Sequence, residues 1–152
     1  MKKLLFIVPT VIALAACTGN NTPAEGSGQD SLTEEQQKDS TIYGRSTEFG
    51  MSSFSLITDA GDTIDLNRGE GTLWGNLDNE GDRFALTIQG AGTDDASVDV
   101  AINLTDVEKF TKDFSVYNGR LILSGDTVSL IDLTADSLIA KGAKGEYRLK
   151  AK

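Results

Sequence analysis

Carboxylates are the groups in this 152-residue chain that could carry acid–base chemistry, because the other usual groups are missing. The sequence holds 23 Asp and Glu residues, one cysteine and no histidine. Lack of histidine excludes Ser-His-Asp and Cys-His catalysis as usually built, and His-ligated zinc, copper or iron. Neither a Ser-x-x-Lys motif nor a Gly-x-x-x-x-Gly-Lys phosphate loop occurs. We therefore expect no catalytic residue and no cofactor, with a carboxylate-based hydrolase as the alternative.

Two groups of acids offer the oxygen ligands that Ca²⁺ prefers. They fall within residues 59–65 and 78–82, where Gly also recurs. Neither group fits the EF-hand loop, because no Gly follows the third acid at the required position. Turns favour Asp and Gly for backbone reasons alone. We interpret both groups as turns and expect no metal.

The lone cysteine stands at the end of a segment with the features of a signal peptide. Lys2 and Lys3 precede an apolar run over 4–14, which is too short for the ~20 residues that span a bilayer. Leu14-Ala15-Ala16-Cys17 resembles a bacterial lipobox. The resemblance implies cleavage before Cys17, a diacylglyceryl thioether on its sulfur and a further acyl chain, such as palmitate, on its amine. Two or more acyl chains anchor a protein stably. The alternative is a secretory signal with an unmodified cysteine.

Charge and the residue after Cys17 bear on location. Without Lys2 and Lys3 the chain holds twelve basic and 23 acidic residues, a formal charge of −11. Nucleic acid and anionic headgroups repel such a surface, so we expect no nucleic-acid partner.

Thr18 stands where inner-membrane lipoproteins often have Asp, which favours the outer membrane. The first acid after Cys17 is Glu25, and both the periplasmic and the outer face stay open.

Composition divides the chain into three parts. Residues 1–16 are the predicted signal peptide. Residues 17–41 hold the lipidated cysteine and a polar stretch with one sizeable apolar residue, Leu32, which predicts a flexible tether. Residues 42–152 have enough apolar residues for one domain.

Apolar residues of the domain alternate with polar ones in short runs separated by Gly, Asn and Asp. Phe54 and Leu56 precede a turn at 59–62, and a matching run follows it. Asn118-Gly119 between two apolar runs is the strongest hairpin signal, because both residues suit the positive φ angles of a type I′ turn. About eight short strands are predicted, in an antiparallel barrel or a sandwich.

One helical signal interrupts the strands. Thr105 and Glu108 match a capping box, and Val107 and Phe110 would share a helix face. The pattern predicts a helix over 106–112 at one end of the sheet. The fold class expected is thus all-β with one short helix.

Several segments resemble small envelope lipoproteins of Bacteroidota. They run over 54–64, 81–87, 101–105, 118–123 and 136–138. The resemblance implies an envelope location and a lipocalin-like or OB-like barrel, and it implies no activity. It also implies O-glycosylation of Asp-Ser-aliphatic and Asp-Ser-Thr tripeptides, which places glycan on Ser31 or Ser40.

The expected function is a lipid-anchored, non-enzymatic binding or interaction module. Its partner would be an envelope protein, a glycan or a small ligand, and a periplasmic inhibitor or folding factor is a further alternative. Trp74 is expected as a core anchor, with a stacking platform for a ligand as the second interpretation. The scattered arginines are interpreted as surface residues.

Overall fold

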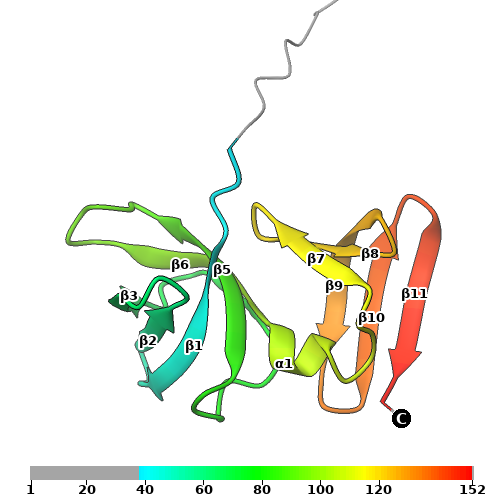
Figure 1. Cartoon of the computed structure of the whole chain (residues 1–152), viewed down its shortest axis with the longest axis horizontal. Helices are drawn as coiled ribbons and strands as arrows, with labels where there is room; N and C mark the ends of the chain where they lie inside the picture. Colours follow the sequence, from blue (N-terminus) through cyan, green and yellow to red (C-terminus); the bar gives the residue numbers. More distant parts are fainter. Residues whose placement is uncertain (1–37, 152) are drawn as a thin grey trace, which may run out of the picture. The chain divides into compact units, whose positions relative to one another are not determined.

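The structure is a computed structural model that describes residues 38–151 (Figure 1). These residues form eleven strands and one short helix, which confirms the all-β class, the barrel and the single helix. The bounds are β1 Ile42–Phe49, β2 Ser53–Thr58, β3 Thr63–Asn67, β4 Thr72–Trp74, β5 Arg83–Gln89, β6 Ser97–Asn103, α1 Leu104–Val107, β7 Phe114–Tyr117, β8 Arg120–Leu123, β9 Asp126–Leu133, β10 Ser137–Gly142 and β11 Gly145–Lys150.

Five strands of the first sheet close into a barrel. The sheet order is β3-β2-β1-β5-β6-β4, and a parallel pairing of Asn67 in β3 with Ser97 in β6 closes the five strands from β3 to β6. β1 pairs antiparallel with both β2 and β5, so it lies in the middle of the wall. β4 pairs in parallel with β6 further along, where Trp74 lies opposite Ile102. β4 therefore continues the wall beyond the point where β3 leaves it.

The barrel encloses an aromatic core. Phe54 and Phe84 are fully buried and meet edge to face with ring centroids 5.3 Å apart, and Phe49 packs 5.1 Å from Phe54. Edge-to-face aromatic pairs add stability beyond the area that they bury. The remaining buried members of this core are Leu56, Leu66, Leu86, Val98 and Ala101.

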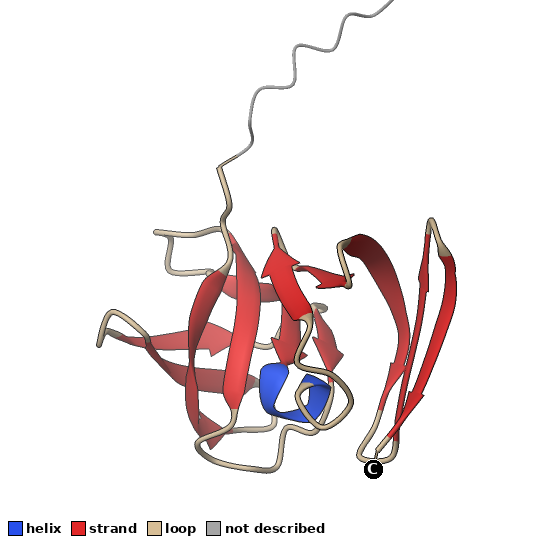
Figure 2. Ribbon diagram, turned by 45° about the vertical axis from the view of Figure 1, so that its right-hand side comes forward, coloured by secondary structure: helices blue, strands red, loops and turns tan. Residues whose placement is uncertain are grey.

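The second sheet is an antiparallel meander in the order β11-β10-β9-β8-β7. Figure 1 labels its strands, and the view in Figure 2 brings that side of the molecule forward. Its inner face supplies Leu121 and Leu138 to a second core. That core also contains Val107 of α1, Ala85 of β5 and Ile102 of β6. The sheet thus covers its apolar face with the helix and with the outer surface of the barrel.

Most predicted runs are strands, and the hairpins at 54–66 and at Asn118-Gly119 are confirmed. Asn118 and Gly119 have φ angles of 46° and 70°, as a type I′ turn requires. The strands number eleven rather than about eight. No strand was predicted over 42–49, where β1 lies. Its Gly44 and Ser46 break the apolar alternation, and a Cβ on Gly44 would collide with Ile57 of β2.

The helix differs from its prediction over 106–112. α1 starts at Leu104, and its N-cap is Asn103, whose side chain accepts a hydrogen bond from the Asp106 N–H. Thr105 does not act as the cap, because its hydroxyl accepts the N–H of Arg83 at 2.9 Å instead. Backbone hydrogen bonds of turns extend the helical conformation as far as Thr111. Within residues 38–151, no helix has the length and apolar character needed to cross a bilayer.

Candidate functional site

A groove of about 370 Å³ lies between the barrel wall and the second sheet. Its walls come from β4 and β6 on one side and from β8, β9 and the β7–β8 turn on the other. Pockets that bind small molecules range from about 300 to 1,000 Å³ and are mostly apolar with a few polar groups. The lining residues are Thr72, Trp74, Val100, Ile102, Gly119, Arg120, Leu121, Thr127, Val128, Ser129 and Leu130.

Trp74 is the aromatic residue of this lining. It is half-buried and packs against the second core, which we call the shared core because the barrel and the second sheet both contribute to it. Its neighbour Leu73 packs into the barrel core. Successive strand residues point to opposite faces, so Thr72 and Trp74 lie on the groove side. Trp74 packs against this core, as expected of a core anchor, and it also lines the groove, where a stacking role toward a ligand stays a prediction.

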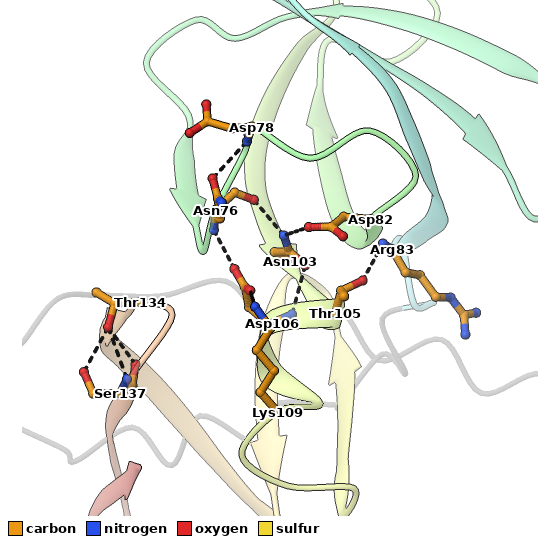
Figure 3. A network of polar contacts seen from close by, with 10 residues as sticks. All are labelled: Asn76, Asp78, Asp82, Arg83, Asn103, Thr105, Asp106, Lys109, Thr134 and Ser137. Carbon is orange, nitrogen blue, oxygen red and sulfur yellow. Dashed lines mark hydrogen bonds and ion pairs between the residues drawn. The ribbon is translucent and has the colours of Figure 1, made fainter. Parts of the chain in front are cut away.

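A buried polar network holds the chain directly after Trp74 (Figure 3). Asn103 and Asp106 are fully buried at the start of α1. The Asp106 carboxylate accepts the Asn76 N–H at 2.6 Å, and the Asn103 amide donates to the Asn76 carbonyl at 2.6 Å. Gly75 makes this approach feasible, because its φ is +93° and a Cβ there would lie 2.8 Å from the Asp106 carboxylate. The network thus holds both backbone groups of Asn76, two residues after Trp74, and Trp74 itself is placed by its pairing with Ile102 in β6.

Lys109 balances the buried carboxylate. Its ammonium lies 2.6 Å from Asp106 Oδ1 and is partly exposed at the edge of the network. The hydrogen bond to Asp106 raises the pKa of Lys109 above its usual value. Asp82 accepts a second bond from the Asn103 amide at 2.8 Å. These groups satisfy one another, so we interpret the network as structural support for the groove.

The β7–β8 turn forms the opposite rim of the groove. Gly119 lies so close to the barrel that a Cβ would be 3.0 Å from Thr87 Oγ1 and 3.3 Å from Val100. Its neighbour Asn118 is held by the residues before β1. Asp39 accepts the Asn118 N–H at 2.9 Å, and the Ser40 N–H donates to the Asn118 side chain at 2.7 Å. We call Asp39, Ser40, Thr41 and Asn118 the N-terminal clasp.

Local hydrogen bonds shift the pKa of two acids outside the groove. The Thr41 hydroxyl, followed by the Asn118 N–H, lowers the pKa of Asp39. The Lys144 N–H is the main cause that lowers the pKa of Asp126, with the Tyr147 hydroxyl contributing. Burial, with the nearby Asp126 carboxylate, raises the pKa of Tyr147. Asp126 therefore holds the β10–β11 turn against the start of β9.

The residues predicted for modification and those considered for Ca²⁺ are distributed as follows. Cys17 and Ser31 lie outside the described residues. Ser40 is exposed, and its hydroxyl lies 3.0 Å from Asn118 Oδ1 within the N-terminal clasp. Over residues 38–151 no group of three acids is arranged to hold a metal ion. Of the acids considered for Ca²⁺, Asp59 pairs with Arg83 and Asp65 accepts the Ser55 hydroxyl.

The groove joins residues that no sequence pattern connects. The sequence predicts Trp74 as a core anchor or a stacking platform and interprets the arginines, Arg120 among them, as surface residues, whereas the groove brings both together with Val100, Ile102 and Leu130. These five residues come from four strands and lie up to 56 positions apart in the chain. Chemically, this surface can bury an apolar body and offer hydroxyl groups and one guanidinium. Its described lining contains no carboxylate.

Comparison of the chain with known proteins gives no match: no family model, no curated protein and no solved structure is significantly similar to it.

Proposed function

We propose that this protein is a non-enzymatic binding module of the cell envelope, and that the groove beside Trp74 is its binding site. The observation that carries the proposal is the groove itself, with its aromatic residue held by a buried network on one side and a fixed turn on the other. Preorganised sites of this kind lose less entropy on binding. A carboxylate-based hydrolase would need acids facing such a cleft, and the described lining offers none.

Envelope attachment belongs to the same proposal. The lipobox-like residues 14–17 support an acylated Cys17, and Thr18 supports a location on the outer membrane, with the module carried at the end of the 17–41 segment. A Cys17→Ser chain should leave the membrane fraction after a carbonate wash, while the parent chain should stay in it. Equal sedimentation of the two chains would contradict the anchor without bearing on the groove.

The groove can be tested with the single tryptophan of the chain. Because Trp74 is the one Trp in the sequence, energy transfer to a bound fluorophore starts from a single donor that lines the groove. We expect the full chain, prepared without acylation as Cys17→Ser, to bind the neutral fluorophore N-phenyl-1-naphthylamine saturably. Trp74 emission should fall as the fluorophore emission rises.

A matched pair of variants makes this test specific. Thr72 and Thr63 are both exposed strand residues, but only Thr72 lines the groove. Thr72→Phe should fill the groove mouth and weaken fluorophore binding at least about tenfold, or about 1.4 kcal/mol. Thr63→Phe should leave binding unchanged. No saturable binding by the parent, or equal binding by both variants, would overturn the proposal.

A further inference from the structure

The groove differs in charge from the rest of the molecule. The chain has 23 acidic and 14 basic residues and a formal charge of −9. Its described groove lining nevertheless contains one charged residue, which is the cation Arg120. A randomly chosen surface of this protein would include acids more often than bases. The local charge therefore favours a ligand with an anionic group, even though the overall charge repels anions.

Arg120 lies at the rim of the groove, beside the β7–β8 turn. It is the first residue of β8 and directly follows the turn that Gly119 packs onto the barrel. Its side chain is exposed and forms no ion pair with any residue between Lys38 and Ala151. A guanidinium presents a planar fork of donors that matches a carboxylate, sulfonate or phosphate group. The fixed turn holds the backbone of this donor in place.

The rest of the lining suits an apolar body of limited size. Trp74, Val100 and Leu130 are half-buried and supply aromatic and aliphatic surface, while Ile102, Leu121 and Val128 lie buried behind it. The volume of about 370 Å³ is near the lower end of the range for small-molecule sites. A folded protein partner or a long chain would extend far beyond it. The dimensions thus indicate a compact amphipathic molecule.

We propose that the groove binds a small amphiphile whose single anionic group pairs with Arg120 while its apolar body lies against Trp74. This inference rests on the proposed function, since it assigns a ligand class to the same site. It makes Arg120 the residue that selects for charge, and it makes the apolar lining the source of affinity that is independent of charge.

Two fluorophores that differ by one group test this proposal. N-phenyl-1-naphthylamine and 8-anilinonaphthalene-1-sulfonate share an anilinonaphthalene body, and only the second carries a sulfonate. Arg120→Gln should raise the Kd of the sulfonate probe about tenfold and change that of the neutral probe less than about twofold. Arg120→Lys keeps the charge but loses the fork, so it should raise the Kd of the sulfonate probe about threefold.

Arg148→Gln is the matched control. It changes the net charge equally, but Arg148 lies on β11 outside the groove and pairs with Glu146 at the surface. This control should leave both probes unaffected. Equal effects of Arg120→Gln and Arg148→Gln, or no effect of either, would overturn the assignment of Arg120. The proposed function would survive that result if Thr72→Phe still abolished binding of the neutral probe, and it would fail if neither probe bound the parent chain.

Discussion

The barrel and the second sheet bury their apolar residues in different ways. The barrel closes around a core supplied entirely by its own wall and the loops joined to it, with Phe54 and Phe84 at the centre. The second sheet is open, and its core is completed by α1 and by Ala85 and Ile102 on the outer surface of the barrel. The barrel thus has the residues to exclude water alone, whereas the sheet depends on its neighbour. The groove lies where these two surfaces separate.

Removal of an aromatic side chain from the barrel core should have the largest effect on stability. Phe84→Ala deletes a fully buried side chain and both of its aromatic contacts, so we expect a loss of about 4 kcal/mol in the free energy of unfolding. Because the sheet needs the barrel surface, both regions should unfold together. Urea transitions followed by Trp74 fluorescence and by far-UV circular dichroism should coincide. Ile57→Ala, at an exposed position of β2, should change stability by less than about 0.5 kcal/mol.

A matching deletion in the second sheet should have a smaller and more local effect. Leu121→Ala removes a buried residue of the shared core, which we expect to cost about 3 kcal/mol. Amides of β7–β11 should exchange hydrogen faster, while those of β1, β2 and β5 keep their protection. A uniform rise in exchange over both regions would show that the barrel does not hold together by itself. Ile131→Ala, at an exposed site on β9, serves as the control.

The contact between the turn and the barrel can be isolated with two glycines. Gly119 and Gly125 have similar φ angles of 70° and 74°, but only Gly119 approaches other atoms. Gly125→Ala should cost about 1 kcal/mol from its left-handed backbone alone. Gly119→Ala should cost about 2 kcal/mol, because the added Cβ also meets Thr87 and Val100. Equal losses in thermal unfolding would mean that the turn does not press on the barrel.

The smallest expected effect depends on pH. The lowered pKa of Asp126 means that its hydrogen bonds stabilise the fold fully above the unfolded value of about 3.9 and lose this contribution as pH falls through the folded value. Asp126→Asn should therefore lower the Tm at pH 7, and the gap to the parent should close in acid. Asp136→Asn, at an exposed site in the β9–β10 turn, should show no such pH-dependent gap. A gap that stays constant down to pH 2 would contradict the charge-dependent role.

Local patterns in the sequence predicted much of this fold, because many of its elements are hairpins. Asn118-Gly119 is a clear example, since two positive φ angles select those residue types. β1 escaped prediction because its place in the middle of the barrel requires small residues such as Gly44 where an alternating pattern would have large ones. The predicted helix start was wrong because the Thr105 hydroxyl accepts the N–H of Arg83 in β5 and does not cap the helix. No local sequence rule reveals such a distant partner.

The candidate site was less predictable than the fold, for a physical reason. Trp74 and Arg120 become neighbours of one groove only after two sheets pack together, and period-two alternation says nothing about that packing. Asp106 looked like an ordinary helix-start acid, and its burial against Asn76 depends on the close approach that Gly75 permits. Such long-range pairings are fixed by tertiary contacts alone.

The N-terminal clasp also determines how a mechanical load would enter the domain. A pull on the backbone at Lys38 reaches Asp39 and Ser40 first, and through Asn118 it strains the turn that carries Arg120. The hydrogen-bond ladders of β1 resist only after these few bonds have yielded. Tension along the chain would therefore deform the rim of the groove before it disturbs the barrel.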